Sequence, residues 1–292
     1  VRIDQMACGY GHTMATTLSG FVFAWGLNVY GQLGLGDLVD RAEPCHVKAL
    51  SEFKISNLAA GHLHSGAVTD TGKVFMWGHN PDCRLFKKLA YYKKSRRTKN
   101  YSLPQYVEEL EHKYMVQLAC GASHSLLVDA DGGVYAAGSP DLGQLGEREY
   151  MFIPKLAKEP YLRVPGFSSL NPAVQIAAGD GFSVILTAGG EVYTCGKGNY
   201  SRLGQGHTHH ILQPRLVDHF ERCLGAKIIE IAAGGRHCLA VSEARVDGDG
   251  QLTRQKLYAW GFGYYHQLGT PQSREDATVP FELPINAAKV KH

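Results

Sequence analysis

Hydrophobic and polar positions alternate with a period of two in many short segments of this chain of 292 residues. The segments are rich in β-branched and aromatic residues, which is typical of β-strands. The links between them, such as LSG, DTG, DADGG and AGG, are short and contain glycine, as tight hairpins require. Three kinds of segment recur, exemplified by ISNLAAG, HSGAVTD and KVFMWG. The pattern predicts an all-β fold made of antiparallel hairpins.

These segments recur in register with two sets of glycines. The first set opens a Gly-x-x-His motif every 52 to 60 residues, and it comprises Gly9, Gly61, Gly121, Gly179 and Gly234. The histidines are His12, His64, His124 and His237, with Phe182 as a variant. The second set follows 17 residues later, or 27 in the last repeat, and comprises Gly26, Gly78, Gly138, Gly196 and Gly261. The three tryptophans of the chain directly precede members of this set at Trp25, Trp77 and Trp260.

A five-fold repeat of this length predicts a repetitive architecture. A fourth extended segment in several repeats contains a proline, which suits an outer strand that need not donate every hydrogen bond. Four strands in 50 to 60 residues are typical of a β-propeller blade. We therefore predict a single propeller domain over 1–292, with repeats at about 1–52, 53–112, 113–170, 171–225 and 226–292.

The residue types at fixed repeat positions suit this architecture. Alanine pairs such as Ala59-Ala60 precede the first glycine, where strands crowd around the central axis. Aromatic residues farther out would fill the space between diverging blades. The motif histidines are expected to hold neighbouring backbones together by hydrogen bonds. The two sets of glycines, the motif histidines and the tryptophans are thus predicted to be architectural.

The most complete copy of the repeat continues from Trp25-Gly26 into Asn-x-x-Gly-Gln-Leu-Gly, which ends at Gly34. Together with Gly-x-x-His, this sequence resembles the repeat of the regulator of chromosome condensation family over nearly the whole chain. Members of that family are seven-bladed propellers. The resemblance therefore implies that the five repeats form part of a seven-bladed ring, or that blades have been lost.

Composition excludes several classes of protein. No run of about 18 apolar residues occurs, so no membrane-spanning helix is expected. The seven cysteines form no C-x-x-C pair, which favours a reducing, intracellular compartment without separating nucleus, cytoplasm and mitochondrion. The motif histidines are accounted for by their repeat position and no P-loop is present, so we expect no enzyme and no cofactor. His207, His209 and His210 supply too few ligands on one face for a metal site.

A basic insertion over 84–103 interrupts the second repeat. Its segment 84–99 holds eight basic residues and no acidic one, whereas the whole chain carries a net charge of only +3. Three interpretations remain open: contact with nucleic acid or an acidic protein, a solvated loop, or a targeting signal. The predicted contact residues are Arg84, Lys87, Lys88, Tyr91, Tyr92, Lys93, Lys94, Arg96, Arg97 and Lys99.

Two further segments break the period. A hairpin insertion over 243–257 carries Asp247-Gly248-Asp249-Gly250 at its expected tip. Family members that exchange nucleotide on the GTPase Ran use a projecting hairpin, and the resemblance implies a similar role for 243–257, although a plain extended turn is the alternative. The proline-containing segment 158–172 is expected to be an extended surface excursion.

The sequence as a whole favours a non-catalytic scaffold that binds a protein or a large assembly through its inserted loops. Two alternatives remain open. One is guanine-nucleotide exchange on a Ran-like small GTPase, which rests on the family resemblance and the hairpin insertion. The other is binding of RNA, DNA or a ribonucleoprotein, such as an organellar ribosome, through the basic insertion.

Overall fold

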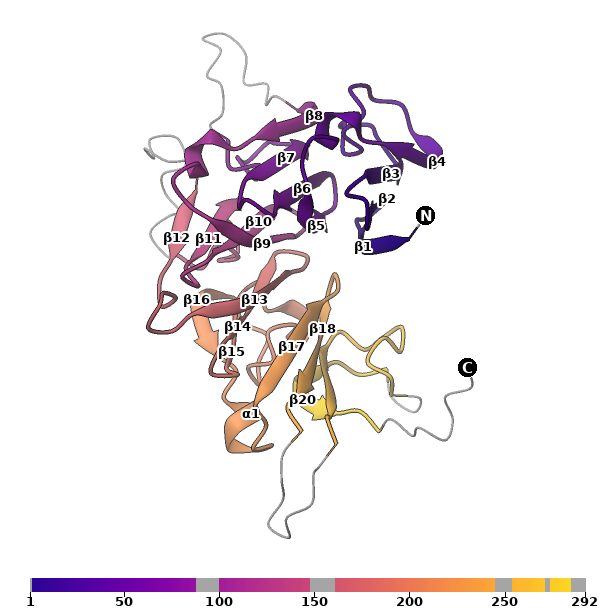
Figure 1. Cartoon of the computed structure of the whole chain (residues 1–292). Helices are drawn as coiled ribbons and strands as arrows, with labels where there is room; N and C mark the ends of the chain where they lie inside the picture. The colour runs from indigo at the N-terminus through magenta and orange to yellow at the C-terminus, as the bar shows by residue number, and fades with distance from the viewer. Residues whose placement is uncertain (1, 88–99, 148–160, 245–253, 271–273, 285–292) are drawn as a thin grey trace.

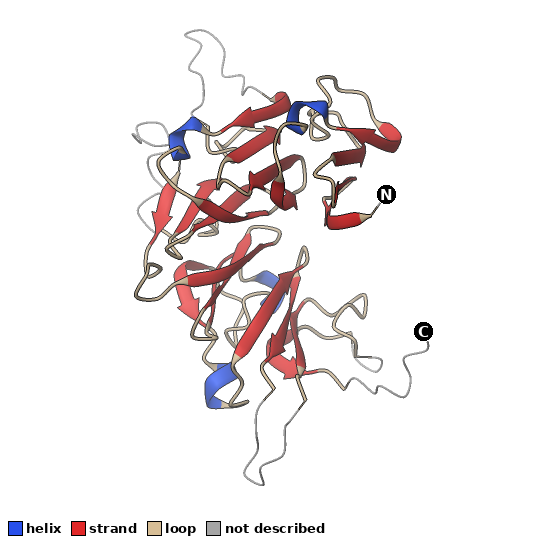
Figure 2. Ribbon diagram, viewed as in Figure 1, coloured by secondary structure: helices blue, strands red, loops and turns tan. Residues whose placement is uncertain are grey.

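The computed structural model describes residues 2–87, 100–147, 161–244, 254–270 and 274–284. These residues form five four-stranded antiparallel sheets, each with its strands in chain order from the inside outward. The sheets stand around a common axis in an arc that is open on one side, between β1 and the sheet of β17–β20 (Figure 1). Almost all regular structure is strand (Figure 2). The predicted all-β fold of four-stranded propeller blades is confirmed.

Each blade comprises four consecutive strands. Blade 1 contains β1 (Ile3–Cys8), β2 (His12–Thr17), β3 (Val22–Gly26) and β4 (Arg41–His46). Blade 2 contains β5 (Ile55–Ala60), β6 (His64–Thr69), β7 (Val74–Gly78) and β8 (Tyr101–Tyr106). Blade 3 contains β9 (Met115–Cys120), β10 (His124–Asp129), β11 (Val134–Gly138) and β12 (Leu162–Val164). Blade 4 contains β13 (Ala173–Ala178), β14 (Phe182–Thr187), β15 (Val192–Gly196) and β16 (Ile211–Leu216), and blade 5 contains β17 (Ile228–Ala233), β18 (His237–Ser242), β19 (Leu257–Gly261) and β20 (Ala277–Glu282).

Short helical turns connect or decorate the blades. The 3-10 turns Lys48–Leu50 and Glu108–Leu110 and the short helix α1 (His219–Arg222) lead from an outer strand to the next blade. Each buries one apolar side chain, Leu50, Leu110 or Phe220, against the blade beside it. A further 3-10 turn spans Asn199–Ser201.

The two sets of repeat glycines have a structural reason. The second set ends the third strand, where its members pair with the motif residue that begins the second strand, as in His12 opposite Gly26. Gly26 has a φ of +102°, in the region that favours glycine. A side chain at Gly9 would collide with the carbonyl oxygen of Gly61 and with the ring of His12. The Gly-x-x-His spacing therefore lets a blade approach its neighbour closely.

The first strand of each blade packs against the second strand of the blade before it, as β5 packs on β2 and β9 on β6. Ile55 and Leu58 on β5 are buried by this contact. Their equivalents in blade 1, Ile3 and Met6, are 51% and 73% exposed. At the other end of the arc, alternate residues of β18 are only partly buried, whereas β6, β10 and β14 are buried throughout. The first strand of blade 1 and the second strand of blade 5 thus expose positions that are buried in the equivalent strands of the inner blades.

The prediction of a surface excursion over 158–172 is wrong for residues 162–164 and for Phe167, whereas Leu170 is 96% exposed. Residues 162–164 form β12, the outer strand of blade 3, which pairs with β11. Leu162, Val164 and Phe167 are buried in the core of that blade. The proline spacing misled the interpretation because blade 3 lacks the proline that marks the outer strand in its neighbours.

Candidate functional site

Three of the four motif histidines, His12, His64 and His124, lie at the boundaries between blades. The Nε2 atoms lie 2.7 to 2.9 Å from serine Oγ atoms of the next blade, in the pairs His12–Ser65, His64–Ser125 and His124–Ser183. Ser65 Oγ donates to the carbonyl oxygen of Gln32 at 2.8 Å, and Ser183 Oγ donates to that of Gln144 at 2.7 Å. The histidines were expected to bind neighbouring backbones. They contact a serine hydroxyl of the next blade instead, and Ser65 and Ser183 donate back to a carbonyl oxygen of the blade that carries the histidine.

This geometry fixes the protonation of two of these histidines. Because the hydroxyl protons of Ser65 and Ser183 are used on carbonyl oxygens, Nε2 of His12 and of His124 must donate. Burial lowers the pKa of His12 to about 4, and it lowers the pKa of His124 to about 3. Both rings are therefore neutral at physiological pH and already engaged, so they are poor candidates for general bases.

At one boundary between blades, both the histidine and its serine partner are replaced. Between blades 4 and 5, Phe182 takes the histidine position and Cys238 takes the serine position. Both side chains are fully buried in one apolar cluster. Cys238 Sγ keeps the equivalent bond, to the carbonyl oxygen of Arg202 at 3.6 Å, and the Phe182 ring needs no partner. No buried donor or acceptor therefore loses its partner at these two positions. The motif position is structural in both forms.

Arg84 must be separated from the predicted basic surface. It occupies the glutamine position of Gly-Gln-Leu-Gly and is only 5% exposed. Its Nη1 donates to the carbonyl oxygen of Ala122 at 3.0 Å, and its Nη2 pairs with Asp82 at 2.8 Å. Arg84 therefore joins blade 2 to blade 3, and its prediction as a surface contact is wrong. The repeat register offered a sign of this, because Arg84 falls at a position where the other repeats carry glutamine or arginine.

Lys87, at the end of the described segment, is partly buried. The remaining predicted contact residues lie outside the described residues: Lys88, Tyr91, Tyr92, Lys93, Lys94, Arg96, Arg97 and Lys99. Most of the hairpin insertion, with Asp247 to Gly250, also lies outside them. Their roles stay predictions.

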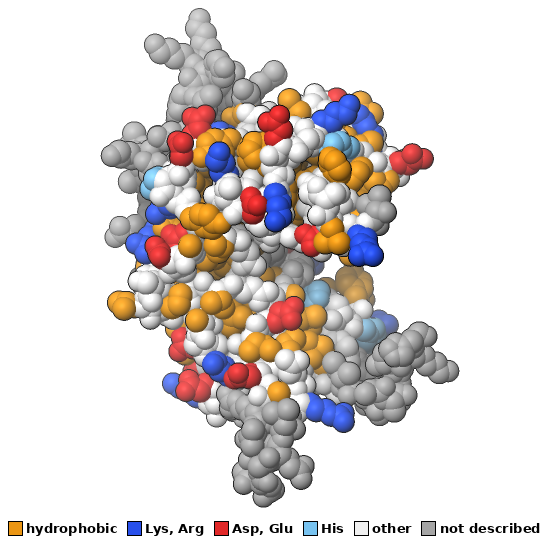
Figure 3. Space-filling view, in the orientation of Figure 1, with side chains coloured by type: hydrophobic (Ala, Val, Ile, Leu, Met, Phe, Trp, Pro, Cys, Tyr) orange, Lys and Arg blue, Asp and Glu red, His pale blue; other side chains and the backbone are white. Residues whose placement is uncertain are grey.

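The connections between the first and second strands and between the third and fourth strands lie at the same end of every blade, because the strands are antiparallel. We call this end the loop face. A central channel of about 560 Å³ opens there, lined by the small residues of the innermost strands and by Tyr10, His62 and Asp180. In the space-filling view the middle of the arc is hollow (Figure 3).

Beside the channel mouth, one carboxylate faces three cations. Asp180 Oδ2 lies 3.5 Å from Lys197 Nζ, 3.4 Å from Arg202 Nη1 and 4.0 Å from Arg236 Nε. Burial alone would raise the pKa of Asp180, but Lys197 and Arg202 together lower it below its ordinary value. The side chain of Arg202 is completely buried, and its Nη1 also donates to the carbonyl oxygen of Asp180 at 2.6 Å. Positive charge exceeds negative charge at this point.

Aromatic rings continue the same surface across blades 4 and 5. We call Lys197, Tyr200, Arg236, Phe262, Tyr264 and Arg274 the aromatic–arginine cluster. The Tyr200 and Phe262 ring centroids are 4.8 Å apart, and Phe262 and Tyr264 are nearly parallel at 6.3 Å. The Arg236 guanidinium lies 5.2 Å from the centre of the Tyr200 ring and 5.7 Å from that of Phe262. Arg274 lies 5.7 Å from the centre of the Tyr264 ring.

The cluster is exposed although its members are large. Tyr200 is 40% exposed and Tyr264 is 52% exposed, while the Arg236 side chain is 48% exposed. Sequence reasoning missed this surface because its residues come from two different repeats. A signal was present: tyrosine stands four residues after the second glycine at Tyr30, Tyr200 and Tyr265, and Arg236 occupies a variable place in Gly-x-x-His.

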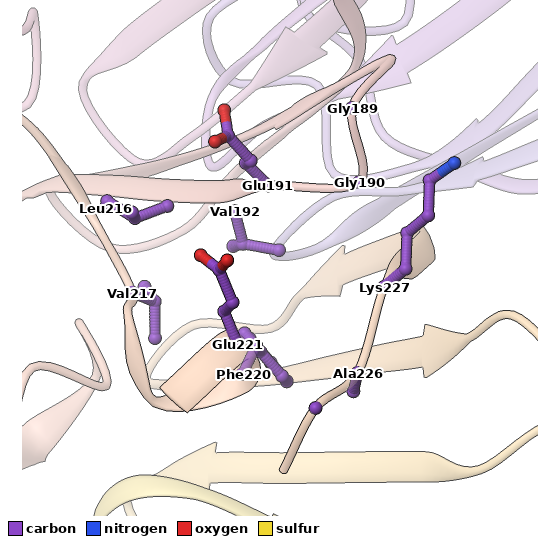
Figure 4. Close-up of a pocket in the computed structure, with 11 residues that line it drawn as sticks. Gly189, Gly190, Glu191, Val192, Leu216, Val217, Phe220, Glu221, Ala226 and Lys227 are labelled. Atoms are coloured by element: carbon purple, nitrogen blue, oxygen red, sulfur yellow. The ribbon is translucent and has the colours of Figure 1, made fainter. Parts of the chain in front are cut away.

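A separate pocket of about 340 Å³ lies at the opposite end of blade 4. Figure 4 shows Glu191 and Glu221 on one side of it and Lys227 on the other, with Val192 and Phe220 between. Blade 2 has a smaller pocket at the equivalent place, between the turn at Gly72 and the connection at Leu110. Because the pocket recurs with the repeat, we interpret it as a feature of blade construction.

The residues described by the structure include no group of three or more histidine, cysteine or acidic side chains placed to hold a metal ion. The rings of His207 and His209 are 5.2 Å apart. Among the described residues, no helix is long and apolar enough to span a membrane.

Five blades with a shared register and repeated polar links between neighbours define a β-propeller built from sequence repeats. The whole chain, residues 1–292, matches the RCC1-like domain, so the chain belongs to the RCC1-like domain family. The resemblance seen in the sequence is thereby confirmed. Propellers of this family have seven blades.

The relatives include much longer proteins. The ultraviolet-B receptor UVR8 of Arabidopsis thaliana is 30% identical over 296 residues, which cover 100% of this chain and 61% of UVR8. The human E3 ubiquitin-protein ligase HERC2 is 32% identical over 275 residues, which cover 92% of this chain and 5% of HERC2. The chain thus spans less than two thirds of the length of either relative.

Two solved structures share the fold. Human WBSCR16 has a TM-score of 0.76 and 22% identity, with 97% of this chain and 67% of WBSCR16 covered. Prp20p of Saccharomyces cerevisiae, which was studied with its binding to Gsp1p and histones, has a TM-score of 0.59 and 23% identity, with 98% and 78% covered.

Proposed function

We propose that this chain is a non-catalytic binding module that holds a macromolecular partner on its loop face, within a larger assembly. The observation that carries the proposal is the aromatic–arginine cluster beside the channel mouth. Tyrosine and arginine dominate the binding energy of many protein interfaces. Tyr264 remains exposed in the turn that follows β19, and Tyr200 remains exposed in the 3-10 turn after β15.

The environment of the titratable groups supports a non-catalytic role. The histidines His12 and His124 are neutral and bonded between blades. Burial raises the pKa of the Cys120 thiol to about 12, and it raises that of Cys195 to about 12, so neither thiol is an activated nucleophile. Among the described residues, none of the seven cysteines forms a disulfide, which supports the proposal of a reducing, intracellular compartment.

Proteins of the same fold bind other proteins. Prp20 has been solved bound to Kap60, and Prp20p was studied for its binding to Gsp1p and histones. These partners belong to those proteins, and the low identity transfers only the fold. They support the general idea that such a propeller presents its surface to proteins.

The proposal is tested by affinity purification of the full-length protein from its native cell, beside a variant with Tyr200→Ala and Arg236→Ala. We expect a discrete set of partners with the wild type and its loss with the variant. A matched control is Arg222→Ala, since Arg222 is exposed on α1, at the opposite end of the blades. Failure to recover any stable partner with the wild type would overturn the proposal.

The two alternative functions have distinct readouts. Accelerated release of nucleotide from a Ran-like GTPase by the purified chain would favour exchange activity instead. A variant with the seven basic residues of 87–99 changed to Gln tests the third possibility, and it leaves the buried Arg84 in place. Loss of RNA or DNA binding in that variant, with a steep dependence of wild-type binding on salt, would favour a nucleic-acid role.

A further inference from the structure

The aromatic–arginine cluster is specific to one boundary of the propeller. The register that brings Tyr200 onto Phe262 also brings Tyr30 onto His79 between blades 1 and 2, with ring centroids 4.3 Å apart. In that second place Leu63 stands at the position of Arg236. The blade architecture therefore accounts for the ring pair, and it does not account for the arginine laid across both rings.

The positive charge of the cluster is held by the fold. Arg202 is completely buried under the surface, with its guanidinium 5.5 Å from the centre of the Tyr200 ring. Its Nη2 is buried and has no hydrogen-bond partner in the part of the chain that the structure describes. Asp180 is the one carboxylate that ion-pairs with Lys197, Arg202 and Arg236 among the described residues. A single carboxylate among three cations leaves the surface attractive to a further anion.

The arrangement of rings and charges favours a peptide over a nucleic acid. Arg236 already covers one face of Tyr200 and of Phe262, and Arg274 covers one face of Tyr264, so fewer ring faces are free for stacking bases. Glu275 and Asp276 directly follow Arg274 in the chain, and they would repel a continuous run of phosphates. A short segment with one or two carboxylates avoids both problems.

We propose that the aromatic–arginine cluster docks an extended segment of a partner protein in which a carboxylate adjoins an aromatic or aliphatic side chain. The carboxylate pairs with the exposed edge of Arg236, since a guanidinium over a ring keeps its N–H groups free at the edge. The apolar side chain packs on Phe262 and Tyr264. This inference rests on the proposed function and names the partner chemistry for the same face.

The test is a random 12-residue peptide display library selected on the purified chain. We expect enriched peptides that combine Asp or Glu with a neighbouring aromatic or aliphatic residue. A synthetic copy of one enriched peptide should bind at least about tenfold more weakly to Arg236→Ala and to Tyr200→Ala. Changing its carboxylates to amides should have a similar effect.

The matched control is Tyr30→Ala, which removes the equivalent ring at the boundary between blades 1 and 2 and should leave binding unchanged. Arg236→Lys keeps the charge but loses the paired N–H groups, and it should bind at an intermediate level. Circular dichroism and thermal unfolding establish that each variant is folded.

Three outcomes would overturn the inference. The first is that no acidic and apolar pattern is enriched, and the second is that the peptide binds the Arg236→Ala variant unimpaired. The third is that a 12-nucleotide poly-uridine RNA requires the cluster while the peptides do not. If native partners are recovered equally well with the variant carrying Tyr200→Ala and Arg236→Ala, the binding-module function survives and this site assignment fails. If none are recovered with the wild type, the function itself fails.

Discussion

Buried polar residues between blades bond in pairs. Their contribution to the free energy of unfolding is therefore a property of each pair and not of one residue alone. His124 donates to Ser183, and Ser183 donates onward to the carbonyl oxygen of Gln144. The chain itself shows the alternative at the next boundary, where Phe182 and Cys238 stand in the same two positions. From these two arrangements we expect that a histidine facing a cysteine, or a phenylalanine facing a serine, stabilises the fold less than either pair found in the chain.

A double-mutant cycle tests this coupling. We expect His124→Phe and Ser183→Cys each to lower the free energy of unfolding by about 1 to 3 kcal/mol, because each leaves a buried polar group without its best partner. The double variant should lose less than the sum by about 0.5 to 3 kcal/mol. Urea unfolding of the four proteins measures the coupling. Strict additivity of the two single changes would contradict it.

The same histidines predict how stability depends on pH. An unfolded histidine has a pKa of about 6.5, whereas burial lowers the pKa of His12 to about 4 in the folded chain and lowers that of His64 as well. Above pH 6.5 both states are neutral and stability is complete. As pH falls from 6.5 toward 4, only the unfolded state gains these protons, so stability decreases, by on the order of 3 kcal/mol for His12 alone.

The midpoint of urea unfolding at pH 7.5, 6.5, 5.5 and 4.5 measures this dependence. The double variant with His124→Phe and Ser183→Cys is the control, because it removes one of the three buried rings without leaving its partner unpaired. Its stability should decrease less steeply between pH 6.5 and 5 than that of the wild type. Equal slopes for the two proteins would show that His124 does not contribute.

At the scale of elements, equal sequence patterns have unequal burial. β1 and β5 both place apolar residues at their first and fourth positions, but only those of β5 are covered by a preceding blade. The contribution of a strand residue to the free energy of unfolding therefore depends on which blade it belongs to. Patterning alone does not contain this information.

Substitutions at equivalent positions make the difference measurable. We expect Leu58→Ala to lower the free energy of unfolding by about 2 to 4 kcal/mol, since it leaves a cavity between blades. Met6→Ala should change it by less than about 0.5 kcal/mol, because Met6 is exposed. Chemical denaturation of both variants is the measurement. An equal loss at Met6 would mean that something covers β1 in solution.

The repeat made the strands predictable, and its irregularities account for the errors. Glycine spacing and period-two alternation located the first three strands of each blade because close approach and pairing admit few other residues. β12 was missed, since blade 3 lacks the proline of other outer strands. The burial of Arg84 and the assembly of Tyr200, Arg236 and Phe262 depend on contacts across blade boundaries, and the sequence shows only the repeat positions of these residues and not the contacts.

At the scale of the whole molecule, the arc has two kinds of blade. Blades 2, 3 and 4 have neighbours on both sides, joined by backbone bonds such as His62 N to Gly121 O at 3.3 Å and Ala122 N to Gly179 O at 3.1 Å. Blades 1 and 5 each have one neighbouring blade among the described residues. In a repeat protein, stability is approximately a sum of terms within repeats and between nearest neighbours. The end blades therefore lack one interface term each.

Hydrogen exchange should reveal this gradient. We expect amide protection to be highest in β6, β10 and β14, and lower in β2 and β18, although all five strands pair with neighbours on both sides within their sheets. Leu58→Ala, at the boundary between blades 1 and 2, should lower protection in blade 1 more than in blade 4, because blade 1 depends on that one interface. The measurement is native-state exchange followed by mass spectrometry of peptides from each blade. Uniform protection across the five blades would show that the arc unfolds as one cooperative unit. In that case the exposed surfaces of β1 and β18 do not weaken the blades that carry them.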